Sequence, residues 1–167
     1  MPTVNTLPRD VLRVHTDGAS RGNPGRAAVG VVVYGSDGML RAELGRDIGI
    51  MTNNRAEYLA VHAGFELLAE MGGRSAHFCL DSELVVKQLQ GLYKVRDSDL
   101  AVLHSQARAL ATRLRSVTYE HVPRARNKRA DELANLALDG KAIHRIIDAV
   151  PPADELLAAE PRQRELF

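Results

Sequence analysis

Residues 11–48, VLRVHTDGASRGNPGRAAVGVVVYGSDGMLRAELGRDI, contain three apolar runs that are separated by two short turn-forming stretches. The first run alternates apolar and polar residues and the second is rich in valine, which is the pattern of β-strands. The pair Asp37-Gly38 is a strong hairpin signal between the second run and the third. Because the turns leave no room for a helical crossover, we predict an antiparallel meander. The predicted strands are residues 11–17, 28–34 and 39–48.

The pattern changes to helical spacing after this meander. Apolar residues recur every three or four positions over residues 54–71, which predicts an amphipathic helix. Thr52 or Asn53 is placed to cap this helix, and Gly72-Gly73 end it. The elements predicted after it are a strand at 75–80, helices at 82–90 and 98–115, a strand at 117–122 and a helix at 127–139.

This order of elements predicts an α/β fold. The three opening strands should pair antiparallel and the strands separated by helices should join in parallel, so we expect a five-stranded mixed sheet flanked by helices. Gly45 in the third strand marks a bulge or a close approach of another backbone. Residues 1–140 are expected to form this domain, and residues 141–167, which include Pro151-Pro152, a C-terminal tail of unknown role.

The bulk properties are those of one globular domain. A chain of 167 residues with 45% hydrophobic residues can bury a core. No apolar run approaches the ~20 residues that span a bilayer, so no membrane partner is expected. The single cysteine, Cys79, excludes an intrachain disulfide and fits a reducing compartment. With no signal-peptide pattern in the first ten residues, a cytoplasmic protein is expected.

Four scattered carboxylates carry the chemical argument. Asp17 ends the first strand and Asp81 ends the strand expected to lie parallel beside it, and open α/β sheets bind ligands at such ends. Glu57 lies one turn into the first helix, and Asp131 lies in the first turn of the last. Four converging negative charges would each cost several kcal/mol to desolvate without compensation. Hard, oxygen-preferring cations such as Mg²⁺ or Mn²⁺ remove that cost, and a pair of them is a standard device for phosphodiester chemistry.

Basic residues gather in two places although the net charge of the chain is only +1. One group just precedes Asp131, and the other surrounds Tyr93. Such segments can bind phosphates even when the whole chain is nearly neutral, and the alternative is an ordinary solvated face. Tyr93 could stack on a base or pack, and the sequence does not choose. The two groups are Arg124, Arg126, Lys128 and Arg129, and Lys87, Lys94 and Arg96.

The segments that hold the four acids resemble the signature segments of type 1 ribonuclease H, in the same order and spacing. They are TDGASRGNPG (16–25), TNNRAEY (52–58), LDSELVVKQ (80–88) and NKRADELA (127–134). The resemblance, over roughly residues 10–140, implies a ribonuclease H-like fold. It also implies a metal-dependent endonuclease that cuts the RNA strand of RNA–DNA hybrids by a two-metal-ion mechanism and leaves 5′-phosphate and 3′-hydroxyl ends.

The resemblance also implies roles for individual residues. Asp17, Glu57, Asp81 and Asp131 would be the catalytic acids and would hold two Mg²⁺ ions, with Mn²⁺ as a substitute. Short amides and hydroxyls suit the 2′-hydroxyls and the minor groove of an RNA strand, although plain turn chemistry also explains them. The expected substrate-binding residues are Asn23, Thr52, Asn53, Asn54, Ser82 and Lys87.

The chain departs from longer members of the family in two ways. Only GLYKVRDSD, residues 91–99, replaces a basic handle, and there is no tryptophan, so we expect the short, handle-less branch and weak hybrid affinity. The loop before the last acid, PRARNKR, lacks the usual histidine, and His121 is predicted to lie on the preceding strand. We expect Arg124 to replace that histidine as a catalytic residue, because an arginine stabilises phosphate charge although it cannot act as a base.

Several alternatives stay open. The chain could be a same-fold nuclease that also cleaves double-stranded RNA, or a non-catalytic hybrid-binding domain. A processed piece of a polymerase polyprotein is disfavoured by the Met1 start, and a monomer is expected. A zinc site at His77 and Cys79 is not expected, because there is no second cysteine and no ligand spacing, and core packing explains Cys79. His15 is expected to be structural.

Overall fold

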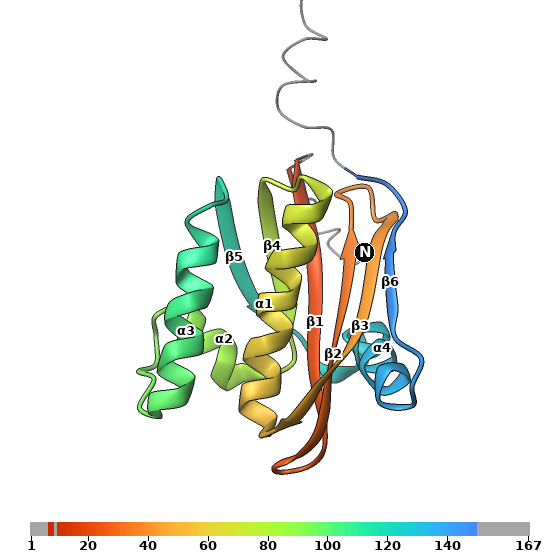
Figure 1. Ribbon diagram of the computed structural model, residues 1–167. Helices are drawn as coiled ribbons and strands as arrows, with labels where there is room; N and C mark the ends of the chain where they lie inside the picture. The colour runs from red at the N-terminus through yellow and green to blue at the C-terminus, as the bar shows by residue number, and fades with distance from the viewer. Residues whose placement is uncertain (1–6, 9, 150–167) are drawn as a thin grey trace, which may run out of the picture.

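A computed structural model describes residues 7–8 and 10–149 of this chain. Its strands are β1 (Val11–Gly22), β2 (Gly25–Tyr34), β3 (Leu40–Met51), β4 (Ser75–Leu80), β5 (Ser116–His121) and β6 (Ile143–Ile146). Its helices are α1 (Asn53–Met71), α2 (Glu83–Leu89), α3 (Ser98–Ala111), α4 (Lys128–Leu138) and a 3-10 turn, η1 (Arg124–Arg126). The strands form one mixed sheet in the order β5-β4-β1-β2-β3-β6 (Figure 1).

The pairing of the strands confirms the predicted fold class. β1, β2 and β3 pair antiparallel, and β4 and β5 join in parallel, β4 on β1 and β5 on β4. The sheet has six strands among the described residues, however, and not the five that were predicted. β6 pairs antiparallel with β3 and comes from the segment that was predicted as a tail. Four residues are too few to show a strand pattern in the sequence, so β6 could not be predicted. It forms because the edge of β3 offers unpaired backbone groups.

The first strand continues beyond its predicted end. Residues 11–17 were expected to form the whole strand, but β1 runs to Gly22 because it stays paired with β2 along the full hairpin. Its pairing with β4 stops earlier, at His15 opposite Cys79. Asp17 therefore lies in the middle of β1, at the point where the neighbouring β4 has ended.

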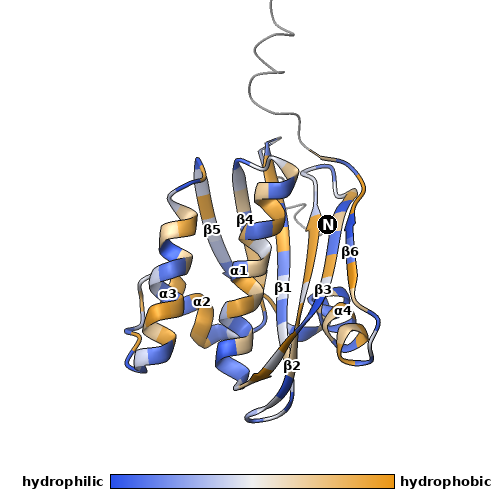
Figure 2. Cartoon of the chain, viewed as in Figure 1, coloured by the Kyte–Doolittle hydropathy of each residue, from blue (hydrophilic) through white to orange (hydrophobic). Residues whose placement is uncertain are grey.

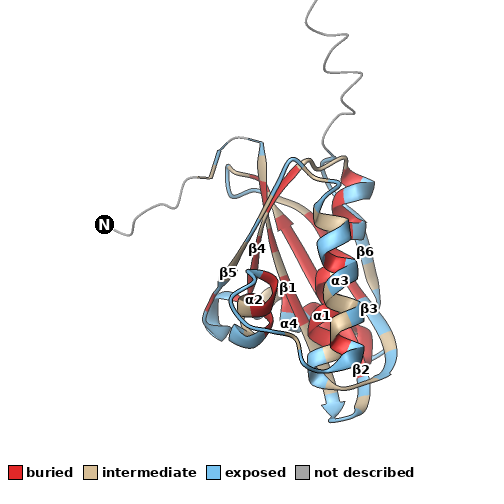
Figure 3. Cartoon of the chain, turned by 90° about the vertical axis from the view of Figure 1, so that its left-hand side faces the viewer, coloured by how far each residue is buried: buried red, intermediate tan, exposed pale blue. Residues whose placement is uncertain are grey.

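The helices cover the sheet on both faces. α1, α2 and α3 lie on one face and α4 packs against β1, β2 and β3 on the other (Figure 1). Apolar residues recur on α1, α3 and the strands beneath them (Figure 2), and buried residues gather on the sheet and on α1 (Figure 3). In this core the rings of Phe65 and Phe78 have centroids 4.7 Å apart. No helix in the described part of the chain is long and apolar enough to cross a membrane.

Three glycines let the helices approach the sheet closely. A Cβ at Gly18 would lie 2.3 Å from the carbonyl carbon of Ala56 in α1. Gly30 and Gly45 are partners in the β2–β3 register, and a Cβ at Gly30 would lie 1.8 Å from the carbonyl oxygen of Ala130 in α4. The close approach predicted at Gly45 is found as well, since a Cβ there would lie 2.5 Å from the carbonyl oxygen of Leu133, and both glycines seat α4, the helix that carries Asp131.

Local hydrogen bonds fix the helix ends that lie near the acids. The hydroxyl of Thr52 accepts a bond from the backbone N–H of Arg55, so Thr52 is the N-cap of α1. The hydroxyl of Ser82 accepts a bond from Val85 in the same way at α2. Gly72 ends α1 with a φ of 73°, a left-handed conformation that glycine adopts without strain.

Candidate metal centre

Three of the four predicted acids meet at one point. One carboxylate oxygen from each of Asp17, Glu57 and Asp81 lies within 4.8 Å of the other two. They come from the middle of β1, the first turns of α1 and the residue after β4. Asp17 and Glu57 are buried, at 6% and 8% exposure. Far-separated parts of the sequence therefore place a compact set of oxygen ligands at the end of the parallel strand pair.

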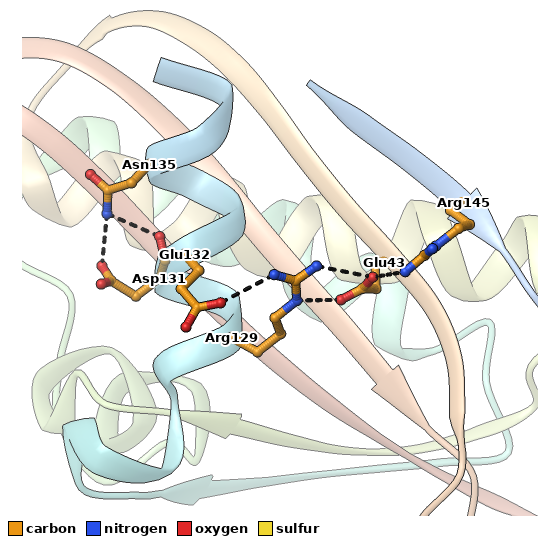
Figure 4. A network of polar contacts seen from close by, with 6 residues as sticks. All are labelled: Glu43, Arg129, Asp131, Glu132, Asn135 and Arg145. Atoms are coloured by element: carbon orange, nitrogen blue, oxygen red, sulfur yellow. Dashed lines mark hydrogen bonds and ion pairs between the residues drawn. The ribbon is translucent and has the colours of Figure 1, made fainter. Parts of the chain in front are cut away.

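Asp131 borders this trio from the first turn of α4. It is exposed, and its carboxylate is one of the groups that raise the pKa of Asp17. The side-chain amide of Asn135, one turn further along α4, donates to the Asp131 carboxylate over 3.2 Å (Figure 4). Asp131 thus adds a fourth carboxylate at the solvent side of the cluster.

Burial and crowding act in the same direction on these acids. Burial, followed by the charges of Glu57 and Asp81, raises the pKa of Asp17 above its ordinary value. Burial and then the charge of Asp81 raise the pKa of Glu57. Burial also raises the pKa of Asp81, although the nearby Arg124 opposes it. Burial and crowding therefore favour the protonated forms of Asp17, Glu57 and Asp81 when no cation is bound, and a divalent cation can take the place of those protons.

The buried carboxylate of Glu57 shows whether the site fits a cation. Glu57 Oε1 accepts a hydrogen bond from the backbone N–H of Gly18 over 3.4 Å. Glu57 Oε2 is buried and has no hydrogen-bond partner among the described residues. A buried, unpartnered carboxylate oxygen is costly unless a proton or a metal ion satisfies it. The all-oxygen donor set fits a hard cation such as Mg²⁺.

Asn127 belongs to this site although it was not singled out in the sequence. It is buried, and its side-chain amide donates to the main-chain carbonyl of Thr16 over 2.8 Å. Its side chain also hydrogen-bonds Asp81, and its oxygen lies 3.2 Å from a ring nitrogen of His15. An asparagine just before a helix usually signals an N-cap, but Asn127 makes no cap bond to α4 and reaches across to β1.

The loop before α4 brings one arginine toward the acids. Arg124 lies in η1, is exposed, and lowers the pKa of Asp81 and of Glu57 through its charge. His121 lies on β5, as predicted, and is its last residue. Of the two basic groups predicted from the sequence, the one before α4 thus contains the arginine whose charge acts on the pKa values of the acids.

Arg129 has a different role from its predicted one. The basic group at 124–129 was predicted either to bind phosphates or to form a solvated face, but Arg129 bonds both carboxylate oxygens of the buried Glu43, at 2.5 and 3.2 Å (Figure 4). Arg145 from β6 contacts the same carboxylate. The hydrogen bond from Arg129 is the main cause that lowers the pKa of Glu43. These bonds tie α4 and β6 to the sheet, so Arg129 is used in the fold.

The predicted substrate-binding residues differ in exposure and in the hydrogen bonds that they make. Asn53 and Asn54 are exposed at the start of α1. The side-chain oxygen of Asn23 in the β1–β2 turn accepts a hydrogen bond from the backbone N–H of Asn53 over 3.1 Å. Thr52 and Ser82 cap helices, and Lys87 is half-buried in the last turn of α2. The β1–β2 turn and the start of α1 lie at one end of the molecule (Figure 1).

The connection from α2 to α3 is short, as expected without a handle. It consists of residues 90–97, and Tyr93 within it is 51% exposed, so this ring is not part of the core. Lys94 and Arg96 beside it are exposed as well. Tyr93 and these two cations remain free to meet a nucleic acid.

This chain is similar to known proteins in sequence and in fold. A family model described as reverse transcriptase-like matches residues 15–137. The crystal structure of ribonuclease H1 from the halophilic archaeon Halobacterium salinarum is 48% identical and superposes with a TM-score of 0.77. That similarity covers 78% of this chain and 98% of the archaeal chain. This chain belongs to the type 1 ribonuclease H family.

Two further ribonuclease H relatives extend the comparison. The LC11 ribonuclease H1, solved in complex with an RNA/DNA hybrid, is 37% identical, with a TM-score of 0.75 over 77% of this chain and 97% of that one. A bifunctional protein of Mycobacterium tuberculosis is 46% identical over 139 residues, which are 83% of this chain. The match covers only 38% of that longer protein.

Proposed function

We propose that this ribonuclease H domain hydrolyses the RNA strand of RNA–DNA hybrids as an endonuclease and leaves 5′-phosphate and 3′-hydroxyl ends. The observation that carries the proposal is the meeting of Asp17, Glu57 and Asp81 within 4.8 Å, with Asp131 beside them. A hybrid duplex is the substrate class held by the LC11 relative. A domain that only bound hybrids would have no use for raising the pKa of buried acids.

Asp17, Glu57, Asp81 and Asp131 are the residues proposed to hold two Mg²⁺ ions, with Mn²⁺ as a substitute. When bound, such ions supply an activated water and stabilise the oxygen that leaves. The unpartnered oxygen of Glu57 supports a cation on the buried side of the cluster. Exposure of Asp131 supports access for a phosphate from the solvent side.

Other side chains of the site position the acids and the substrate. Asn127 holds Asp81 and ties the last loop to β1. Arg124 is proposed to stabilise negative charge on the phosphate, since its guanidinium already acts on Asp81. The proposed contacts to the sugar edges of the hybrid are Asn23, Thr52, Asn53, Asn54, Ser82 and Lys87.

The setting of the activity is also part of the proposal. A reducing cytoplasm suits a chain with one buried cysteine, and we propose that the protein acts there on hybrids as a monomer. Removal of replication primers or of stray hybrids is the process that such a specificity serves.

Cleavage of end-labelled duplexes tests this proposal. RNA–DNA, RNA–RNA and DNA–DNA duplexes of one sequence are incubated with Mg²⁺ or Mn²⁺, and Asp81→Asn serves as the control for contaminating nuclease. We expect cuts in the RNA of the hybrid that disappear with Asp81→Asn and with chelator. Cleavage of RNA–RNA at a similar rate would favour the wider-specificity alternative, and tight hybrid binding with no cleavage in either metal would favour the non-catalytic one.

A further inference from the structure

A second group of metal-ligating side chains lies outside the acid cluster, on β4 and β5. A ring nitrogen of His77, the sulfur of Cys79 and a carboxylate oxygen of Glu120 all lie within 4.8 Å of one another. No ligand spacing for such a site is visible in the sequence. The third donor is 41 residues from Cys79 and comes into place only through the pairing of β4 with β5.

The sheet register places these donors on one face. Cys79 is the direct partner of Glu120, and His77 lies two residues earlier on the same strand. Phe78, between them, points to the other face, where it packs on Phe65 of α1. α4, the helix on the same face as the donors, packs on β1, β2 and β3, and α1, α2 and α3 lie on the opposite face of the sheet (Figure 1). The group opens to solvent on the Glu120 side, since that side chain is 34% exposed and His77 is 12% exposed.

The ligands are already oriented by neighbouring groups. The second ring nitrogen of His77, Nδ1, lies 2.6 Å from the hydroxyl of Thr118, which leaves Nε2 directed at Glu120, also 2.6 Å away. A hydrogen bond to the outer nitrogen of a histidine is the usual support for metal binding by the inner one. The guanidinium of Arg13 lies 3.7 Å from the Cys79 sulfur, whereas burial raises the pKa of that thiol.

We propose that His77, Cys79 and Glu120 bind one transition-metal ion of the Zn²⁺ class, with the remaining coordination position open to water. Imidazole, thiolate and carboxylate are the three side-chain ligands that Zn²⁺ uses in proteins. A thiolate ligand selects such an ion over Mg²⁺, so this site and the all-oxygen site of Asp17 and its neighbours differ in metal preference. Binding replaces the thiol proton of Cys79, which is released to solvent, and the His77–Glu120 contact opens to admit the ion.

Cobalt provides a direct test, because Co²⁺ occupies zinc-type sites and a Co²⁺–thiolate bond absorbs in the near ultraviolet. Cys79 is the only cysteine of the chain, so any such band reports this site alone. The full-length protein is titrated with Co²⁺ in the presence of excess Mg²⁺. We expect a saturable band at one equivalent of Co²⁺, bleached by stoichiometric Zn²⁺ and absent from Cys79→Ser. Asp81→Asn should keep the band, because its carboxylate belongs to the other site.

Two ligand variants separate a built site from a thiol that binds metal alone. Glu120→Gln keeps the shape of a half-exposed side chain and removes its charge, and His77→Ala removes the imidazole; each should raise the Co²⁺ midpoint about tenfold or more. Thr118→Val should raise it by a smaller factor through loss of its bond to His77. Absence of the band in the folded wild-type protein, or identical midpoints in wild type, Glu120→Gln and His77→Ala, would overturn the proposal.

Discussion

Asn127 and Thr16 lie 111 residues apart in the sequence and are joined by a hydrogen bond of 2.8 Å from the side-chain amide of Asn127 to the main-chain carbonyl of Thr16. The bond connects the loop before α4 to β1, one residue before Asp17. Asp131 follows four residues after Asn127, so this contact sets the position of the fourth acid relative to the other three.

Asn127→Ala should therefore reduce both stability and turnover. Loss of a buried hydrogen bond that leaves a carbonyl without its partner costs about 1–3 kcal/mol of unfolding free energy. Turnover should fall more than the affinity for hybrid, because the acids lose their mutual position. Gln90→Ala is a matched control, since Gln90 also donates from its amide to a main-chain carbonyl over 2.8 Å, but at an exposed place. Equal effects of the two variants in urea unfolding and in hydrolysis would contradict the role given to Asn127.

Asp17→Asn should abolish hydrolysis and yet stabilise the metal-free protein. Because burial and neighbouring charges raise the pKa of Asp17, folding favours its protonated form. The wild type is then penalised as the pH rises above the ordinary pKa of an aspartate, whereas the amide is not. We expect the variant to gain about 1–2 kcal/mol at pH 7 in chelator and nothing near pH 3.5.

Magnesium should reverse this difference. Binding to the folded wild type raises its melting temperature by mass action, and the variant, which lacks one ligand, should gain much less. Circular dichroism melts with and without Mg²⁺ measure both effects. Glu83→Gln, an exposed acid at the start of α2, is the control and should change stability by less than about 0.5 kcal/mol. A metal-free Asp17→Asn protein less stable than wild type at pH 7 would refute the prediction.

Gly30→Ala should displace α4. A Cβ at Gly30 would lie 1.8 Å from the carbonyl oxygen of Ala130, so the helix must move. Overpacking of this kind costs about 1–3 kcal/mol, and hydrolysis should fall because α4 carries Asp131. Gly38→Ala is the control: nothing lies within 4 Å of its Cβ, so only its φ of 80° resists the change, at about 1 kcal/mol. Full activity of a folded Gly30→Ala protein would show that α4 tolerates the shift.

Glu43→Gln should weaken the attachment of α4 and β6 in a pH-dependent way. Glu43 is buried between Arg129 and Arg145, and loss of its charge should cost about 1–3 kcal/mol at pH 7. Since the pKa of Glu43 is lowered in the folded protein, its contribution is present above the ordinary glutamate pKa and is lost as pH falls through the folded value. Urea unfolding should show the gap between wild type and variant at pH 7 and a smaller gap below about pH 4. Glu132→Gln, an exposed partner of the same Arg129, should show neither.

Arg124→Ala should lower turnover about 10- to 100-fold and change hybrid affinity by less than about threefold, because the guanidinium acts on the charge that develops at the phosphate. Single-turnover hydrolysis and fluorescence anisotropy separate the two quantities. Arg126→Ala is the neighbouring control: its charge lowers the pKa of Glu120 and is not among the main causes that shift the pKa values of Asp17, Glu57 and Asp81. Equal turnover of the two variants would leave Arg124 without a special role.

Much of this molecule could be predicted because its signals are local. Strand periodicity, the Asp37-Gly38 turn and the cap at Thr52 each depend on a few neighbouring residues, and the order of elements followed from them. The four acids could be singled out because each lies in its own recognisable segment. Their meeting followed from the rule that ligands gather at the ends of adjacent parallel strands.

The features that were missed all depend on contacts between distant segments. Asn127 was predicted only as the first residue of a helix, and its bond to β1 depends on the fold. Arg129 was grouped with its neighbouring cations, and its partner Glu43 lies 86 residues earlier. Glu120 joins His77 and Cys79 only through strand register. β6 is too short to carry a pattern of its own, and its pairing with β3 depends on an edge that the sequence does not display.

The pairing of β6 with residues 42–45 of β3 has a consequence for where the domain ends. A chain shortened after Gly140 would leave backbone amides and carbonyls at the edge of β3 unpaired. Glu43 would lose Arg145 and keep only Arg129 as a partner. A bare sheet edge is a template for a strand from another molecule, so such a truncated protein is exposed to self-association and aggregation. β6 thus covers the edge of β3 and prevents a strand of another molecule from pairing there.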